Sequence, residues 1–351
     1  MFTYFYKQTE ERSDISPPLP INIFRQASNA ILILMKLITI IIPTFNEEQS
    51  IPALYDRLTK LAKSNKKYNF EFLFVNDGSR DNTYNLIKEY AEKDNQILCV
   101  NLSRNFGQEI AIIAGIDNAN GDAAVIIDAD LQDPPELIPD MIKLWEEGYD
   151  DVYARRTSRE GETWFKKFSA KAFYNILQKS TNIPIQIDTG NFRLFDRRCI
   201  DAIKQIRESQ RHSKGIFSWI GYKKKEITYR RNPRLAGKTK WNVLKLTGLA
   251  IDGITSFTIA PLRISSFFGA IISLIAFIFI VIIIVKKAAL GDPVAGYPSL
   301  MAVILFLGGI QLLSLGIIGE YIGRIFNESK NRPLYFIEEI YHKESSKKSR
   351  R

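Results

Sequence analysis

The chain has 351 residues, 46% of them hydrophobic, and a net charge of +10. This length suits one large domain or two smaller ones, and the positive charge suits an anionic partner such as nucleic acid, a phosphorylated ligand or an acidic membrane surface. The two cysteines, Cys99 and Cys199, lie far apart and form no CxxC pair, and there are only two histidines. This usage argues against a disulfide framework and against a zinc site, and it favours a reducing, cytosol-facing compartment.

Residues 1–34 are interpreted as a variable, poorly structured extension. Their acidic stretch TEERSD is unlike the basic start of a secretory signal. The apolar run AILILMKLITIIIP that follows is short and is interrupted by Lys36. We therefore expect a buried strand at Leu37–Ile42, and Met35 is an alternative start of the chain.

From Leu37 onward, short apolar runs alternate with helix-like segments. The runs are LITIII, FEFLFVN, ILCVNLS, DAAVIIDAD and DDVYAR. Such alternation predicts an α/β fold with a doubly wound, mostly parallel sheet. We place this domain at residues 35–235. Ligands of such sheets bind outside the carboxyl ends of the strands, and polar residues follow each of the five runs.

Any nucleotide at this edge would be held without either of the two common phosphate-binding loops. The chain contains no GxGxxG after its first strand and no GxxxxGK[ST] anywhere, so the dinucleotide fingerprint and the P-loop are both absent.

The stretch VIIDADLQDPPE places Asp128, Asp130 and Asp133 at the end of the fourth apolar run. Like charges repel, so a carboxylate pair such as Asp128 and Asp130 is unfavourable for stability alone. It becomes favourable when a divalent cation binds, because Mg²⁺ and Mn²⁺ prefer oxygen ligands and often take only one or two from the protein. A solvated acidic turn is the simpler alternative. Asp77, at the end of the second run, favours a site for a metal–diphosphate complex.

Two segments between the sheet and the C-terminal part are amphipathic and basic. One covers residues of about 162–180 and the other residues 236–262, and both interleave lysines with tryptophan and other apolar residues. This pattern predicts helices that lie in the membrane interface. The alternative is ordinary domain helices packed on the sheet. A nucleic-acid partner is not expected.

Two uncharged stretches, Ile264 to Val285 and Tyr297 to Ile318, each have 22 residues. A helix of that length spans about 33 Å, close to the bilayer core of about 30 Å. A pair of buried core helices is the alternative, but core helices rarely run so long without a charge. We predict a transmembrane hairpin over residues 263–322 and a basic tail over residues 323–351.

The charges around this hairpin predict its orientation. The flanks outside it are rich in lysine and arginine, whereas the connection between the two stretches carries only Lys286 and Lys287. The positive-inside rule then places the large N-terminal part and the tail in the cytoplasm.

Five motifs occur in order along the chain: ITIIIPTFNEE, FLFVNDGSRDNT, LSRNFGQ, IDADLQDPPE and DTGNFRLFDRR. Together they resemble the family 2 glycosyltransferases with the GT-A fold. More narrowly, the chain is similar to the polyprenyl-phosphate glycosyltransferases, including GtrB-like glucosyltransferases and dolichol-phosphate mannose synthases. The similarity covers about Leu37 to Leu334, and the two C-terminal stretches favour the GtrB-like branch. The Q-x-x-R-W motif of processive synthases is absent.

The resemblance implies roles for the matching residues. It implies that Pro43, Asn46, Glu47, Asp77 and Asp128 border the nucleotide, that Asp128 and Asp130 hold Mg²⁺ or Mn²⁺, and that Gln132 lies beside the sugar or the acceptor. It places Arg155, Arg156, Arg234, Lys238 and Lys240 at phosphates, a task that suits arginine. For Lys238 and Lys240 a lipid headgroup contact is nearly as plausible.

One position departs from the family pattern. From the resemblance we expect GDFRL in many relatives, whereas this chain has GNFRL with Asn191. Either Asp188 replaces that carboxylate or the acid is not essential.

The resemblance also implies the reaction and its setting. A sugar, most simply glucose from UDP-glucose, moves with inversion onto a polyprenyl phosphate such as undecaprenyl phosphate, at the cytoplasmic face of a bacterial inner membrane. A homotetramer is implied as well. GDP-mannose, UDP-N-acetylglucosamine or a UDP-aminoarabinose is an alternative donor, and a non-catalytic, membrane-anchored nucleotide-sugar binding protein is an alternative function.

Overall fold

A computed structural model describes residues 35–157, 186, 189–209, 211, 213–230, 259–290 and 296–343. Several predicted features lie outside these residues. They are the extension 1–34, the amphipathic segment at about 162–180, and nearly all of the segment 236–262.

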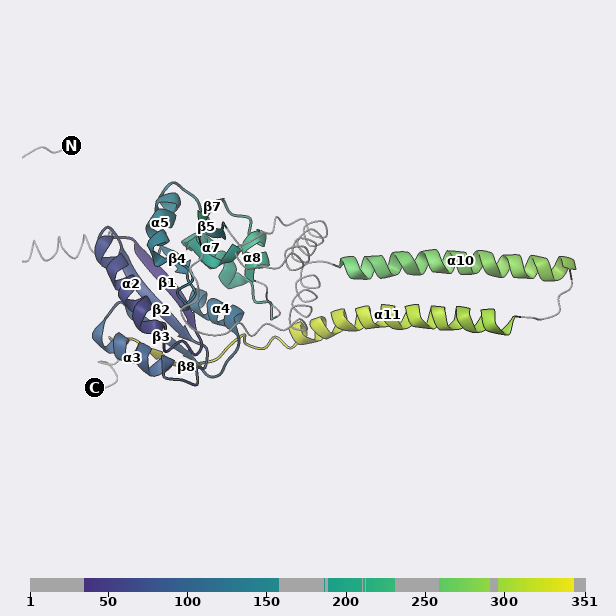
Figure 1. Cartoon of the computed structure of the whole chain (residues 1–351), viewed down its shortest axis with the longest axis horizontal. Helices are drawn as coiled ribbons and strands as arrows, with labels where there is room; N and C mark the ends of the chain where they lie inside the picture. The colour runs from purple at the N-terminus through teal and green to yellow at the C-terminus, as the bar shows by residue number, and fades with distance from the viewer. Residues whose placement is uncertain are drawn as a thin grey trace, which may run out of the picture.

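An eight-stranded sheet forms the centre of the N-terminal domain, with the strand order β7-β5-β6-β4-β1-β2-β3-β8 (Figure 1). Four parallel strands form its middle, and they correspond to the first four apolar runs: β1 (Leu37–Thr44), β2 (Asn69–Asn76), β3 (Ile97–Leu102) and β4 (Ala123–Ile126). The predicted α/β fold with a mostly parallel sheet is confirmed.

The two margins of the sheet are mixed. On one side β6 (Thr189–Asp196) runs antiparallel between β4 and β5 (Asp151–Arg156), and β7 (Lys224–Tyr229) pairs parallel with β5. On the other side β8 (Ile337–Tyr341) runs antiparallel to β3. The five apolar runs therefore left three strands unpredicted.

Helices cover both faces of the sheet, as expected for strands that are apolar throughout. Ile40, Phe72 and Phe74 belong to one buried cluster, and Ile41 and Leu73 belong to the other. Three α-helices and a short 3₁₀ turn pack on the first face: α2 (Ile51–Ser64), α3 (Thr83–Lys93), η1 (Pro135–Leu137) and α5 (Ile138–Glu146). Three pack on the second: α4 (Gln108–Asn118), α7 (Arg197–Gln205) and α8 (Ser213–Trp219).

The helices follow from local sequence signals. In α2 the apolar residues Ile51, Leu54, Leu58 and Leu61 recur at helical spacing and are all buried. Helix α7 begins after Asp196, whose side chain accepts a 2.9 Å hydrogen bond from the backbone N–H of Arg198. An N-terminal cap of this kind satisfies a donor that lacks a partner in the helix.

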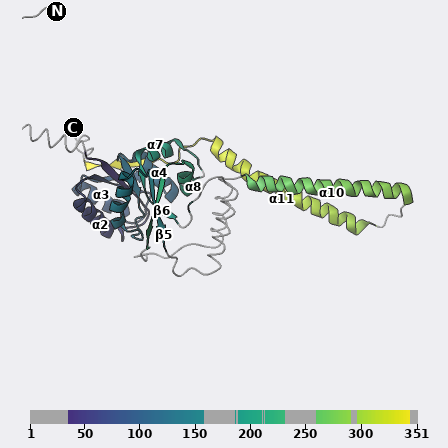
Figure 2. The same ribbon diagram turned by 90° about the horizontal axis from the view of Figure 1, so that it is seen from above.

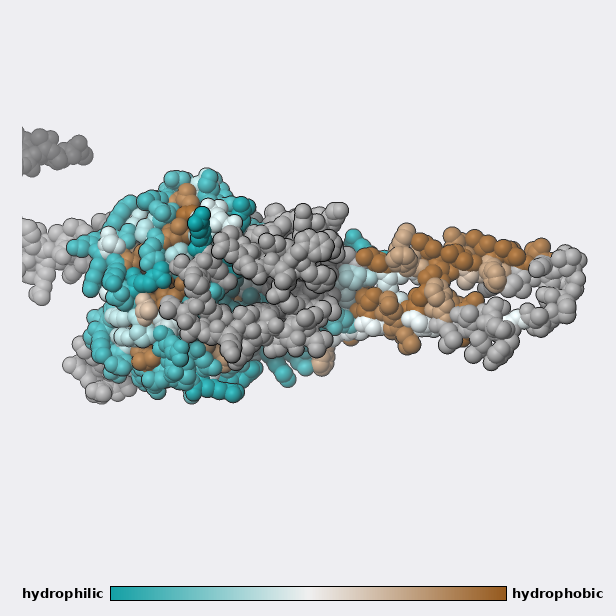
Figure 3. Space-filling model, viewed as in Figure 1, coloured by the Kyte–Doolittle hydropathy of each residue, from teal (hydrophilic) through white to brown (hydrophobic). Residues whose placement is uncertain are grey.

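Two long helices, α10 (Ala260–Leu290) and α11 (Tyr297–Ser329), extend together away from the domain (Figures 1 and 2). Each contains a stretch long and apolar enough to cross a membrane, at Pro261–Phe279 and Phe306–Ser329. Apolar side chains dominate their surface, whereas the domain surface is mostly hydrophilic (Figure 3). Two candidate membrane helices were predicted here, and the structure has them.

The segment after α11 is more than a basic tail. Helix α11 continues to Ser329, whereas the predicted hairpin ends at residue 322. The chain then returns to the domain, and β8 becomes the last strand of its sheet. The sequence IEEIY concealed this strand, because two glutamates interrupt its apolar pattern.

Candidate active site

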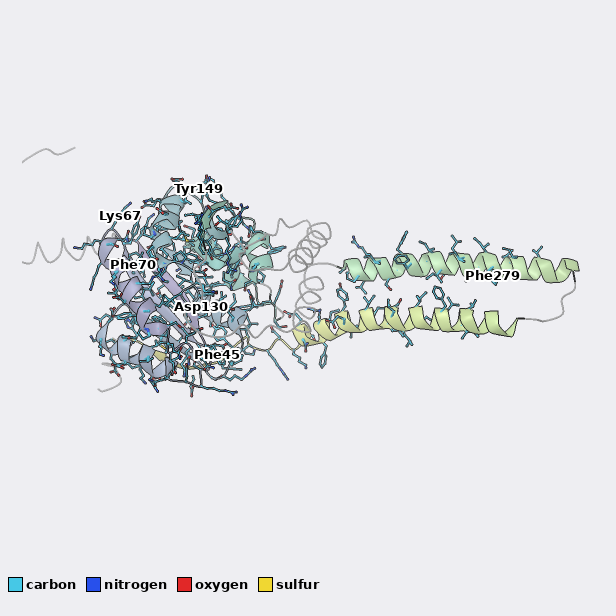
Figure 4. The ribbon with its side chains drawn as sticks, viewed as in Figure 1. Phe45, Lys67, Phe70, Asp130, Tyr149 and Phe279 are labelled. Carbon is cyan, nitrogen blue, oxygen red and sulfur yellow. The ribbon has the colours of Figure 1, made fainter. Side chains whose placement is uncertain are left out.

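The loops that follow β1, β2, β3 and β4 meet at the carboxyl edge of the sheet, the place where such sheets bind ligands. Phe45, just after β1, and Asp130, after β4, lie nearer to the helix hairpin than Lys67 and Phe70 at the amino end of β2 (Figure 4). The carboxyl edge is therefore the one turned toward the candidate membrane helices.

The loop after β1 is held by the loop after β2. The Asn46 backbone N–H donates to Ser79 Oγ at 3.0 Å, and Asn46 Oδ1 accepts from the Arg80 N–H at 2.8 Å. The Glu47 N–H donates to Thr83 Oγ1 at 2.8 Å. Asn46 has a φ of 56°, a conformation that asparagine tolerates better than most residues. These bonds fix the loop that carries two of the predicted nucleotide residues, Asn46 and Glu47, whereas the third, Pro43, belongs to β1.

Gly78 allows the loop after β2 to touch the loop after β3. Its φ is +65°, and a Cβ on it would lie 2.6 Å from both Arg104 C and Asn105 N. Backbone atoms cannot move aside as a flexible side chain can. Only glycine therefore fits at this contact.

Asp77 is buried and joins the same two loops. Its carboxylate accepts hydrogen bonds from the backbone N–H groups of Phe106 at 2.7 Å and Gly107 at 2.9 Å. Burial raises the pKa of Asp77, although these two hydrogen bonds oppose the rise. The sequence predicted that Asp77 meets the base of a nucleotide, which remains a prediction. In the structure its carboxylate organises the loop after β3.

The acidic loop after β4 carries both predicted metal ligands. Gln108, at the start of α4, donates through Nε2 to Asp128 Oδ1 at 2.8 Å, and the Gln132 N–H donates to Asp130 Oδ1 at 3.2 Å. Leu131, between them in the chain, has a φ of 61° while its side chain is buried. An apolar residue seldom adopts this backbone conformation, and such strain is concentrated at functional sites.

Arg156 faces the acidic loop from β5. Its Nε donates to the hydroxyl of Tyr229 at 3.3 Å, and that hydroxyl donates to Asp133 Oδ1. Burial lowers the pKa of Arg156, but the bond to Tyr229 and the negative charges of Asp133 and Asp128 outweigh this effect, so its pKa lies above the usual value. A permanently charged guanidinium is thus held beside the predicted metal site.

The other predicted basic residues are placed differently. Arg155, the neighbour of Arg156, forms a 3.3 Å ion pair with Glu226 of β7. Arg234, Lys238 and Lys240 lie outside the described residues. Their assignment to phosphates stays a prediction.

The motif GNFRL lies in β6, and its arginine is held in the protein interior by an ion pair. Arg193 is fully buried and pairs with the buried Asp151 at 3.2 Å. Asn191 is 8% exposed, and its Oδ1 accepts no hydrogen bond among the described residues. Asp188, the suggested replacement, lies outside the described part of the chain.

Three residues of this edge were missed by sequence reasoning. Gln108 belongs to the motif LSRNFGQ, which was recognised without a role for its glutamine. Tyr229 is the last residue of β7, and the charged sequence of that strand gave no apolar signal from which to predict it. Lys214, on α8, is half-buried, and burial together with the positive charge of Arg156 lowers its pKa, whereas the negative charges of Glu109 and Asp128 oppose the shift.

The donor set fits a divalent cation of the Mg²⁺ type. Asp128 and Asp130 provide carboxylate oxygens from one short loop. Within the described ranges, no three acidic, histidine or cysteine side chains form a metal-binding group. Two carboxylates are nevertheless enough for a cation that takes its remaining ligands from phosphates and water.

Comparison with known proteins identifies the family of the chain. Residues 39–204 match the family described as glycosyl transferase family 2, and residues 260–325 match the GtrB C-terminal hairpin. An uncharacterized glycosyltransferase of Synechocystis sp. is 49% identical over 304 residues, which cover 87% of this chain and 95% of that protein. The prophage bactoprenol glucosyl transferase homolog of Escherichia coli K12 is 43% identical over 303 residues, which cover 86% of this chain and 99% of that protein.

Among solved structures, the mannosyltransferase PcManGT of Pyrobaculum calidifontis, in complex with GDP-Man and Mn²⁺, is 16% identical with a TM-score of 0.40. That similarity covers 87% of this chain and 94% of the other. The relatives of high identity, together with the two matched families, determine the assignment. The chain belongs to glycosyltransferase family 2, in the polyprenyl-phosphate group that carries the GtrB-type C-terminal hairpin.

Proposed function

We propose that this glycosyltransferase moves a glucose residue from UDP-glucose to a polyprenyl phosphate, with inversion, at the cytoplasmic face of a bacterial inner membrane. The observation that carries the proposal is the acidic loop after β4, with Asp128 and Asp130, set against the charged Arg156 at the edge that is turned toward two candidate membrane helices. The relatives named as bactoprenol glucosyl transferases support glucose and the lipid carrier.

Each half of the reaction has residues in this chain that suit it. Asn46, Glu47 and Asp77 lie in linked loops that would hold the nucleotide. Asp128 and Asp130 would hold Mg²⁺ or Mn²⁺, which when bound supplies positive charge to the diphosphate. Arg156 would stabilise the negative charge that develops as the diphosphate departs.

The acceptor needs little activation. A phosphate monoester has a second pKa of about 6 and is therefore mostly a dianion at neutral pH. Its oxygen forms the new bond to the anomeric carbon while the bond from that carbon to the diphosphate oxygen breaks. No enzyme nucleophile is needed, so an α-linked donor gives a β-linked lipid sugar. Gln132 is proposed to lie beside the sugar or the incoming phosphate.

The basic residues near the membrane complete the proposal. Arg155, Arg234, Lys238 and Lys240 are proposed to contact the lipid phosphate or the leaving group, and the interfacial segments and the hairpin would keep the acceptor at the height of the site. We further propose a homotetramer.

The test is a donor panel with the full chain in lipid nanodiscs. UDP-glucose, GDP-mannose, UDP-N-acetylglucosamine and a UDP-aminoarabinose are each incubated with undecaprenyl phosphate and Mg²⁺ or Mn²⁺, and the lipid products are identified by mass spectrometry. We expect glucosyl-phosphate lipid from UDP-glucose, with a β linkage by NMR. Transfer from another donor alone would replace glucose in the proposal. Nucleotide binding without any transfer would favour the non-catalytic alternative.

A further inference from the structure

The last turn of α11 and the chain that follows it are both attached to the domain. Asn331, with a φ of 46°, follows the end of α11. Glu328 Oε2 accepts from the N–H and the hydroxyl of Ser209, at 3.0 and 2.6 Å. The Tyr335 hydroxyl donates to Asp117 Oδ2 at 2.8 Å. The segment between the hairpin and β8 therefore follows a defined path over the domain.

Strand β8 then reaches the loop after β3. The Ser103 N–H donates to the carbonyl of Phe336 at 3.0 Å, directly before the strand. Within β8, the neighbouring glutamates have different partners. Glu339 accepts from the Tyr84 hydroxyl and forms a 3.3 Å ion pair with Lys88, both on α3, whereas Glu338 accepts from Asn101 on β3.

Glu338 is the first member of a row of hydrogen bonds that ends at the nucleotide loop. Asn101 Nδ2 donates to Glu338 Oε2 at 2.9 Å, and Asn76 Nδ2 donates to Asn101 Oδ1 at 2.7 Å. The Ser79 N–H donates to Asn76 Oδ1 at 3.4 Å, and Ser79 Oγ accepts from the Asn46 N–H at 3.0 Å. The two asparagines are buried, and they connect three neighbouring strands.

A carboxylate at the start of this row determines its direction. An ionised carboxylate only accepts, so Asn101 must turn its NH₂ group toward Glu338 and its oxygen toward Asn76. Asn76 must in turn donate to Asn101, which leaves its oxygen for the Ser79 N–H. The charge of Glu338 thus selects one orientation of both buried amides.

The row lies along an open pocket of about 750 Å³ between the loops after β2 and β3 and strand β8, and all of Asn76, Ser79, Asn101 and Glu338 line it. Water reaches such a pocket. On this side, β8 and the residue before it accept hydrogen bonds from Asn101 of β3 and from the Ser103 N–H.

We propose that the strand after the second membrane helix is part of the nucleotide site, and that Glu338 is a positioning residue for the loop that carries Asn46. The proposal rests on the assignment of that loop to the nucleotide sugar. It means that the site is incomplete until the chain has passed through the hairpin and returned to the sheet.

The test compares three variants of the full chain in nanodiscs: Glu338→Ala, Glu338→Gln and, as a matched control on the same strand, Glu339→Ala. The affinity for UDP with Mn²⁺ is measured by calorimetry, and the KM values for UDP-glucose and undecaprenyl phosphate are measured separately. We expect Glu338→Ala to weaken UDP binding and raise the donor KM about three- to tenfold, the usual effect of one lost hydrogen bond. The lipid KM should stay unchanged.

The two remaining variants separate positioning from folding. Glutamine keeps an acceptor oxygen but adds a donor NH₂ group, so Glu338→Gln should recover only part of the UDP affinity that Glu338→Ala loses, and Glu339→Ala should bind UDP like the wild type. Equal weakening by Glu338→Ala and Glu339→Ala, or no weakening by Glu338→Ala, would overturn the proposal. A wild-type protein that binds neither UDP nor GDP would instead overturn the function on which it rests.

A double-mutant cycle tests the row itself. Ser79→Ala removes the acceptor at the other end, next to Asn46. If the row of hydrogen bonds as a whole holds the loop that carries Asn46, either change alone already frees that loop. The effects of Ser79→Ala and Glu338→Ala on UDP affinity should then be less than additive. Strictly additive effects would show that the two ends act independently and would contradict the proposal.

Discussion

The hydroxyl of Tyr229 donates a hydrogen bond to the buried carboxylate of Asp133. The same hydroxyl accepts from Nε of Arg156 at 3.3 Å, so one side chain on β7 links the acidic loop after β4 to the guanidinium on β5. Burial raises the pKa of Tyr229, and the charge of Asp133 raises it further, so the hydroxyl keeps its proton at neutral pH. The residue therefore acts as a fixed bridge between opposite charges.

Replacing this bridge tests whether the position of Arg156 matters for transfer. Tyr229→Phe keeps the ring, which packs edge-on against Phe192 with centroids 6.0 Å apart. We expect kcat to fall roughly tenfold, equal to about 1.4 kcal/mol of transition-state stabilisation, with little change in the KM for the donor. Tyr153→Phe, on the neighbouring strand, is the control. Steady-state kinetics that show the same kcat for both variants would exclude the role.

Asp130→Ala tests the metal site directly. The variant should lose metal-dependent transfer, because Asp128 is the one predicted ligand that would remain and the cation would be held more weakly. Asp140→Ala removes a carboxylate from the exposed side of α5, where it pairs with Lys143, and should keep full activity. Transfer is measured over a titration of Mn²⁺, and circular dichroism checks the fold. An Asp130→Ala protein with wild-type activity at the same Mn²⁺ concentration would refute the assignment.

The parts of the site that are local in sequence could be predicted. The apolar run of β4 leads straight into Asp128 and Asp130, and their proximity follows from the chain itself. The linked loops after β1 and β2 were also placed correctly at one edge, because parallel strands bring their carboxyl ends together.

The parts of the site and the fold that the sequence did not predict depend on contacts between residues far apart in the chain. Arg156 was selected for its charge, but its connection to Tyr229 and Asp133 joins segments that no local pattern relates. Strand β8 has the exposed sequence IEEIY, and it forms because β3 offers an unpaired edge after the chain returns from the hairpin. Continuous apolar runs mark strands that are buried on both faces, and IEEIY is not such a run.

Asp77 predicts opposite effects of pH on stability and on binding. Burial raises its pKa above the ordinary value of 3.8. The folded protein therefore binds this proton more tightly than the unfolded chain does, and the contribution of Asp77 to the free energy of unfolding falls as the pH rises from 3.8 to the raised pKa. Nucleotide affinity should change the other way, because the N–H groups of Phe106 and Gly107 are both held by the ionised carboxylate.

The measurement compares the wild type with Asp77→Asn. Urea unfolding at a series of acidic pH values should show that the stability of the wild type relative to the variant decreases as the pH rises. At neutral pH the variant should bind UDP more weakly, since an amide accepts through one oxygen and turns an NH₂ group toward the other backbone donor. A variant with the same pH profile of stability as the wild type would show that Asp77 does not titrate in this range.

The ion pair between Arg193 and Asp151 predicts a large loss of stability when one partner is removed. Both side chains are fully buried, and Lys224 Nζ lies 3.9 Å from the same carboxylate. Burial raises the pKa of Asp151, but the positive charges of Arg193 and Lys224 oppose the rise. Asp151→Ala would leave the arginine charge buried without its carboxylate, which typically costs about 3–5 kcal/mol.

Removing both charges should cost less than removing one. The double variant Asp151→Leu, Arg193→Met fills the space with apolar side chains of similar size, and such exchanges are often close to neutral. The free energies of unfolding are measured by urea denaturation of the single and double variants. Arg193 supports β6 between β4 and β5, so the single variant should lose stability and transfer together, and the double variant should regain both. If the double variant regains stability without transfer, the arginine of GNFRL has a role in the reaction that its buried position does not reveal.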